Sequence, residues 1–161
     1  MIASRQTVLW LLLAAAPAAP LQAAAQSCTA AATTTNFGSY NPQSASALDA
    51  NGTITLSCVA HPVALVLGYT IALSTGGAGN YSPRRMSAGA NTLNYQLYTD
   101  LLRTTPWGDG SGGSSAVSGG LTLSLLNAVS VPHTAYGRVP AAQTSAVAGS
   151  YSDLITVTVT Y

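Results

Sequence analysis

The sequence contains no lysine and no glutamate, and charged residues make up only 6% of its 161 residues. Five arginines and four aspartates leave a formal net charge of +1, so the chain lacks the basic surface that attracts nucleic acid or anionic membranes. We therefore expect no nucleic-acid partner. The surface must consist mainly of Ser, Thr, Asn, Gln and Gly, and this composition with its near-zero net charge suits extracellular β-proteins that associate with other chains.

Histidine and cysteine are also scarce, with two of each in the chain. His61 and His133 both stand next to prolines in expected loops, and the C-x2-C spacing of zinc sites is absent. We therefore expect no metal site.

The first 25 residues have the three parts of a secretory signal peptide. Arg5 provides the positive charge, residues 8–16 form the apolar core, and Ala23-Ala24-Ala25 forms a cleavage site of the A-x-A type. Two prolines make the apolar stretch too short for a membrane span. The sequence predicts a signal peptide over residues 1–25, a single domain over residues 26–161, and no membrane span once the signal is removed.

Export places Cys28 and Cys58 in an oxidising compartment, where two cysteines in a small domain indicate a disulfide. The alternative is a pair of free, buried thiols. We predict the Cys28–Cys58 disulfide.

Apolar and polar residues alternate with period two in several short runs, which are separated by Gly, Pro, Asn and Ser. In residues 53–58 the even-numbered positions are apolar, so Cys58 lies on the buried face of that strand. Similar runs cover residues 69–74, 92–97 and 121–125. No run in the mature chain keeps a 3.6-residue period, so we predict an all-β domain made of two packed antiparallel sheets.

The run over residues 152–161 is predicted to be the last strand, and its apolar face carries Ile155, Val157, Val159 and Tyr161. An apolar edge with no following strand is an aggregation hazard that proteins normally avoid. Either another chain covers this edge or the strand lies centrally in its sheet. Strand addition by a partner is an established use of such edges, so these four residues are the candidate partner-binding edge.

Several segments together resemble the spore coat protein U domain, the pilin domain of archaic (Csu-type) chaperone-usher pili. They occur in the family's order and span the predicted mature chain. The segments are Cys28, Asn36-Phe37-Gly38-Ser39-Tyr40, residues 52–58, residues 93–100, Trp107-Gly108-Asp109-Gly110, Tyr136-Gly137-Arg138-Val139-Pro140 and residues 149–153.

This resemblance implies an incomplete immunoglobulin-like β-sandwich that lacks its last strand. A periplasmic chaperone would hold the domain until the N-terminal extension of a neighbouring subunit fills its groove. The implied partners are the chaperone, an outer-membrane usher and other pilus subunits. The implied location is the cell surface, reached through the periplasm, with a role in adhesion or biofilm formation.

Fibre-forming members of this family carry a donor segment before the first cysteine, whereas only Gln26 and Ser27 precede Cys28 after the predicted cleavage. We therefore expect a subunit that accepts a donor strand without giving one, which would place it at the fibre tip. Two other functions stay open. One is a non-fibrous secreted coat or envelope protein, and the other is a carbohydrate-binding module that uses Trp107 as a candidate surface contact. Packing is the alternative role for Trp107.

Three patterns suggest catalysis or cofactor binding without supporting it. Residues 108–113 match G-x-G-x-x-G, but no helical pattern follows them, so we expect a flexible loop whose glycines adopt positive φ and no cofactor. Ser114 and Ser115 lack the flanking pattern of a catalytic serine. Asp100, Asp109 and Asp153 allow a carboxylate pair for glycoside hydrolysis, but we expect them to cap turns. We predict that the protein is not an enzyme.

Two arginine features receive structural interpretations. Arg138 is expected to pair with one of the aspartates at positions 100, 109 and 153 and to order a turn. Arg84-Arg85 is expected to form a solvated surface.

Overall fold

The computed structural model describes residues 25–61, 65–123 and 127–161. Except for Ala25, the predicted signal peptide lies outside these residues, and so does Leu125 of the run at 121–125. No helix in the described ranges is long and apolar enough to span a bilayer.

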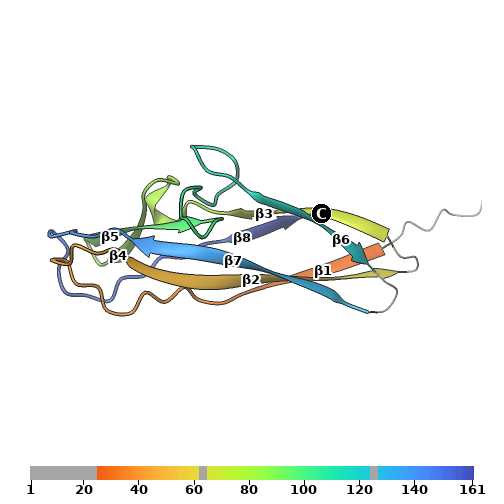
Figure 1. The fold of residues 1–161 in the computed structure, drawn as a ribbon, viewed down its shortest axis with the longest axis horizontal. Coiled ribbons are helices and arrows are strands. Elements are labelled where there is room, and N and C mark those ends of the chain that lie inside the picture. Colours follow the sequence, from red (N-terminus) through yellow and green to blue (C-terminus); the bar gives the residue numbers. More distant parts are fainter. Residues whose placement is uncertain (1–24, 62–64, 124–126) are drawn as a thin grey trace, which may run out of the picture.

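The described residues form two antiparallel sheets that pack face to face (Figure 1). The five-stranded sheet has the order β1-β2-β7-β5-β4 and the three-stranded sheet has the order β6-β3-β8. A single 3-10 turn, η1, follows β3. The prediction of an all-β sandwich is confirmed. The bounds are β1 Ala25–Ala32, β2 Leu48–His61, β3 Leu65–Leu73, η1 Gly76–Ala78, β4 Arg84–Ala88, β5 Asn91–Tyr98, β6 Val117–Leu123, β7 Val129–Val139 and β8 Val157–Thr160.

Period-two alternation sends one face of each strand into the space between the sheets. In β2 the alternate residues Ile54, Leu56 and Cys58 are buried, as the pattern predicts. The runs at 69–74 and 92–97 are likewise strands with their apolar residues inward. The resulting core contains Ile54, Leu56, Cys58, Leu67, Tyr69, Ile71, Leu73, Leu93, Tyr95, Leu97, Trp107, Leu121, Leu123, Ala135 and Val139.

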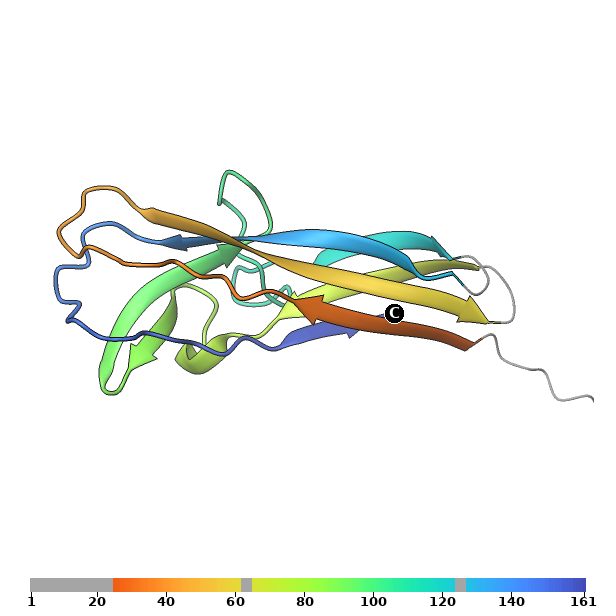
Figure 2. The same ribbon diagram turned by 90° about the horizontal axis from the view of Figure 1, so that it is seen from below.

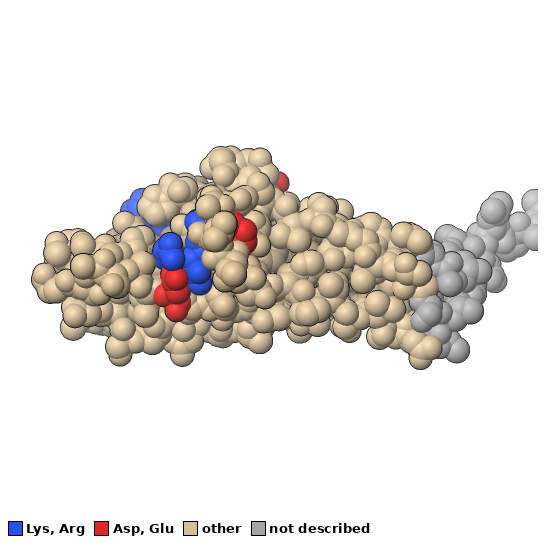
Figure 3. All heavy atoms as spheres, viewed as in Figure 1, with Lys and Arg blue, Asp and Glu red and all other residues tan. Residues whose placement is uncertain are grey.

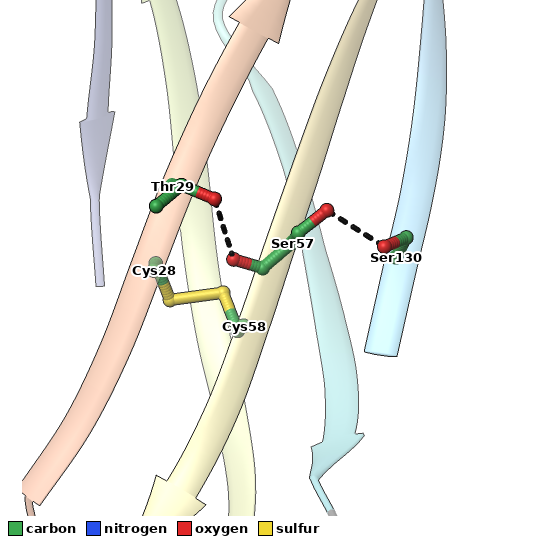
Figure 4. The surroundings of a disulfide bond; sticks show 5 residues. All are labelled: Cys28, Thr29, Ser57, Cys58 and Ser130. Atoms are coloured by element: carbon green, nitrogen blue, oxygen red, sulfur yellow. Dashed lines mark hydrogen bonds between the residues drawn. A yellow bond between two sulfur atoms is a disulfide. The ribbon is translucent and has the colours of Figure 1, made fainter. Parts of the chain in front are cut away.

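Cys28 of β1 and Cys58 of β2 stand directly opposite each other and form the predicted disulfide (Figure 4). It faces the core, where Cys58 is almost completely buried. On the outer face β2 is linked to its other neighbour β7, because the Ser57 and Ser130 hydroxyls lie 2.6 Å apart. The disulfide therefore ties the edge strand β1 to the centre of its sheet.

The last strand is shorter than the sequence pattern predicts. The predicted strand covers residues 152–161, whereas β8 is Val157–Thr160. Residues 152–156 instead cross from one sheet to the other. Ser152 pairs with Ser87 of β4, and the Thr156 carbonyl accepts a hydrogen bond from Ser74 N, just after β3. Alternation alone does not reveal this change of sheet.

Candidate functional site

The strand β8 lies at an edge of the three-stranded sheet. It pairs with β3 on one side through residues 157–160, and no described strand pairs with its other side. Figure 2 shows β1, an edge strand of the five-stranded sheet, on the same side of the sandwich as β8. The two sheets are therefore open along the same side of the sandwich.

The four residues of the candidate partner-binding edge alternate as the sequence predicts. Ile155, Val157 and Val159 are half-buried and pack against the core, and Tyr161 remains 48% exposed. The side chains of Ile155, Val157 and Val159 thus lie against the core at the open side of the sandwich.

A cleft of about 1170 Å³ lies between the sheets at this open side. One wall is the chain that follows β1, residues 33–40, and the other is the chain that leads into β8, residues 146–153 with Ile155 and Val157. Core side chains form the floor. They come from β2, β5 and β7 and include Ile54, Leu93, Tyr95, Leu97, Ala135 and Val139.

Asp153 is a charged group in the wall of this cleft. Its Oδ1 accepts hydrogen bonds from the backbone N–H groups of Gly77 (2.8 Å) and Leu154 (2.9 Å), and its Oδ2 accepts one from the Tyr95 hydroxyl (2.7 Å). Burial and this carboxylate raise the pKa of the Tyr95 phenol well above its usual range. Asp153 therefore does more than cap a turn, because it joins three separate segments.

Arg84 corrects the expectation of a solvated Arg84-Arg85 pair. Arg85 is exposed, but the Arg84 side chain is fully buried. The Arg84 guanidinium donates hydrogen bonds to the carbonyls of Ser74 and Trp107 and to Gln96 Oε1. Burial lowers the pKa of Arg84, an effect that the nearby Tyr95, Tyr81 and Asp153 oppose. These carbonyls are distant in sequence, and this explains why local pattern did not reveal the burial.

The structure also corrects the partner of Arg138. Arg138 pairs with Asp49 through two hydrogen bonds of 2.7 and 2.9 Å, across the β2–β7 ladder, and not with any of the three expected aspartates. Arg103 reaches the same carboxylate at 3.3 Å. The hydrogen bond from Arg138 holds the pKa of Asp49 below its ordinary value. On the face of the molecule drawn in Figure 3, most of the visible charged side chains lie in one half.

Asp100 and Asp109 cap turns, as predicted. Asp100 accepts hydrogen bonds from the backbone N–H groups of Thr104 and Thr105, and Asp109 accepts one from Ser111 N. Gly110, Gly112 and Gly113 have positive φ, as expected for a glycine-rich loop. Ser114 is buried, and its hydroxyl donates to the Ser111 carbonyl. These candidate catalytic groups therefore have structural roles.

Trp107 is wrong as a candidate surface contact. Its side chain is 0% exposed, and its indole N–H donates a 2.9 Å hydrogen bond to the Ile71 carbonyl in β3. The packing role is the correct one of the two alternatives. Trp107, the residue named for sugar contact in the carbohydrate-binding hypothesis, is therefore not accessible to a sugar.

His133 stacks edge-on against Tyr69 across the two sheets, with its Nε2 2.9 Å from the Tyr69 hydroxyl. Burial lowers the pKa of His133. The described part of the chain contains no group of three or more His, Cys, Asp or Glu that could hold a metal ion.

Comparisons with known proteins agree with this geometry. Residues 13–158 match the family model described as Spore Coat Protein U domain. The chain is 35% identical over 136 residues to "Protein U" of Myxococcus xanthus, covering 80% of this chain and 72% of that protein.

Among solved structures, the fold resembles a chain of the CsuC–CsuE chaperone–tip adhesion subunit pre-assembly complex, from archaic chaperone-usher Csu pili of Acinetobacter baumannii. The TM-score is 0.54 and the identity 22%. The match covers 84% of this chain and 40% of that chain, so this chain spans less than half of its length. At this identity the likeness concerns the fold alone.

Proposed function

Because the chain belongs to the spore coat protein U domain family, we propose that it is a structural subunit of a chaperone-usher surface pilus. In this proposal it is secreted through the periplasm, where a chaperone holds it, and passes through an outer-membrane usher to the cell surface. It contributes there to adhesion or biofilm formation. The proposal includes no enzymatic activity.

The observation that carries the proposal is the unpaired side of β8 beside a cleft whose floor consists of core side chains. An extended strand from another subunit would pair with β8 and place alternate side chains over the cleft floor. The half-buried Ile155, Val157 and Val159 would then become part of a continuous core. Covering this edge would also remove the aggregation hazard that it presents.

We place the subunit at the fibre tip because the residues just before Cys28 are already paired within its own sheet. Ala25, Gln26 and Ser27, which directly precede Cys28, pair with residues 59–61 in the domain's own five-stranded sheet. They are therefore committed to β1 and are not available for donation. N-terminal sequencing of the secreted protein tests this placement. A mature start well upstream of Cys28, with alternating large apolar residues, would contradict it.

Co-expression with a periplasmic chaperone from the source organism tests the main proposal. We expect the chain to co-purify with the chaperone and to lose this binding when Ile155, Val157 and Val159 are all changed to Asp. Val66→Asp is the matched control, because Val66 is 77% exposed and lies on β3 away from the cleft lining. If the chain is soluble and monomeric alone and the chaperone does not capture it, the proposal fails.

A second candidate function is a non-fibrous coat or envelope protein, which the description of the matching family favours. In that case copies of the chain would close their open edges against one another. Electron microscopy of the cell surface separates the two functions. Fibres that disappear with the gene support the pilus subunit, and a continuous layer without fibres supports the coat protein.

A further inference from the structure

The residues just before β8 form a short connection between the two sheets, residues 152–156, which we call the crossover segment. At one end, Ser152 exchanges two backbone hydrogen bonds with Ser87 of β4, of 2.9 and 3.1 Å. At the other end, Thr156 bonds to Ser74, the residue after β3. The crossover segment therefore decides where β8 begins.

Asp153 is the most connected side chain of this segment. It accepts hydrogen bonds from Gly77 of η1, from Leu154 within the segment, and from Tyr95 of β5. Bonds to an ionised acceptor are roughly twice as strong as neutral ones. A Cβ at Gly76 would overlap the Asp153 carboxylate, so glycine at this position leaves the space that the carboxylate fills.

Arg84 supports the Thr156 end of the crossover segment through Ser74. Its Nε and Nη2 donate to the Ser74 carbonyl at 3.2 and 2.8 Å. The Ser74 N–H donates to the Thr156 carbonyl, and the Ser74 hydroxyl accepts from Thr156 N–H, both at 2.9 Å. A buried cation thus fixes Ser74, and Ser74 fixes the residue that precedes β8.

The strand that follows has little to hold it in place by itself. It has four residues, and it pairs with β3 on one side only. Short strands with exposed backbone and few buried contacts open locally at low free-energy cost. Without a further constraint, β8 would fray whenever its other side is empty.

We infer that Asp153 is a positioning residue that holds β8 in its paired register before a partner strand arrives. The inference rests on the proposed function, because an edge that receives a strand benefits from being ordered in advance. A partner strand then binds without first ordering the acceptor, and this raises its affinity. Tyr95 contributes by donating a hydrogen bond to Asp153. Gly76 contributes by leaving space for the Asp153 carboxylate.

Hydrogen exchange on the full-length chain, measured amide by amide, tests this role directly. We expect Asp153→Ala to speed exchange in β8 about tenfold, with the amides of β2 and β7 unchanged. Tyr95→Phe removes one of the three bonds and should have a smaller effect at the same amides. Asp153→Asn keeps one acceptor oxygen and should restore part of the protection.

A glycine pair gives a matched control. Gly76 and Gly79 both have positive φ, 67° and 69°, so an alanine is strained equally at either position. Only at Gly76 would the added Cβ meet Asp153, because nothing lies within 4 Å of a Cβ at Gly79. Gly76→Ala should therefore speed exchange in β8, and Gly79→Ala should not.

Capture by the co-expressed chaperone tests whether the positioning of β8 by Asp153 affects partner binding. We expect Asp153→Ala to weaken capture about tenfold. If wild type and Asp153→Ala are captured equally, or if exchange in β8 is unchanged, the inference is overturned while the proposed function stands. If exchange rises equally in every strand, Asp153 is only structural and the inference is overturned. If the wild-type chain is not captured at all, the proposed function fails and the acceptor role fails with it.

Discussion

The strands β2 and β8 have the same kind of sequence but different neighbours. Thr53-Ile54-Thr55-Leu56 and Thr156-Val157-Thr158-Val159 both alternate threonine with an aliphatic residue. Ile54 and Leu56 are buried to 4% and 0% exposure, whereas Val157 and Val159 are only half-buried.

The difference comes from pairing. β2 has β1 on one side and β7 on the other, whereas β8 has β3 alone. Alternation predicts that a strand exists and which face turns inward, but it does not report how many neighbours the strand has. The incomplete burial of β8 therefore goes with its pairing on one side only among the described strands, and the following predictions test this difference.

The largest effect is expected in β2, the strand with a neighbour on both sides. Leu56→Ala should lower the free energy of unfolding by about 4 kcal/mol, because it leaves a cavity where β1 and β7 restrict collapse around β2. Urea denaturation of the purified chain measures this loss. A loss of less than about 1 kcal/mol would mean that the core around β2 is much looser than its burial indicates.

The disulfide tests how firmly β1 is held to β2. Reduction, or replacement of Cys28 and Cys58 together by serine, should cost roughly 3.5 kcal/mol on the chain-entropy model for their 30-residue separation. The oxidised chain in the same buffer without reductant is the control. Equal urea midpoints with and without reductant would show that the β1–β2 pairing needs no covalent link.

The strand β8, which is paired on one side, should respond less than β2. Val157→Ala is expected to cost only about 1 kcal/mol in the uncomplexed chain, because the side chain is half-buried and one side of β8 is empty. In complex with the chaperone the same substitution should cost more. Equal losses in the two states would indicate that no partner strand packs against Val157.

The parts of the fold that depend on local alternation were predictable, and those that depend on distant acceptors were not. Residues 53–58 carry their pattern within six positions, and the disulfide follows from export and cysteine count. Arg84 looks like a surface residue in sequence, since its acceptors at Ser74, Gln96 and Trp107 are brought together only by the fold.

Two strands illustrate the same limit. β1 is rich in alanine and lacks strong strand formers, so its conformation depends on its eight pairs with β2 and on the disulfide. The strand at β8 was anticipated from its alternation, which left an edge and a central position open, but the crossover segment was not anticipated. Its hydrogen bonds involve Ser74, Ser87 and Tyr95, which are far away in sequence.

The smallest effect concerns the ion pairs that Asp49 forms near the N-terminal end of β2. No ion pair is found in β8 among the described residues. The pKa of Asp49 is lowered in the folded chain, chiefly by its hydrogen bond from Arg138. Its contribution to stability is therefore present above the unfolded value, near 3.8, and is lost as the pH falls through the lower folded value. Because the Asp49 side chain is 37% exposed, solvent screening limits this contribution to about 0.5 kcal/mol.

Urea denaturation of wild type and Asp49→Asn at several pH values isolates this contribution from those of the other aspartates. We expect wild type to be the more stable by about 0.5 kcal/mol near neutral pH, with the difference vanishing once the pH has fallen below the lowered pKa of Asp49 and shrinking in high salt. A difference that persists at low pH would mean that Asp49 stabilises the β2–β7 ladder through packing. In that case packing, and not the Asp49–Arg138 ion pair, would hold this end of the β2–β7 ladder.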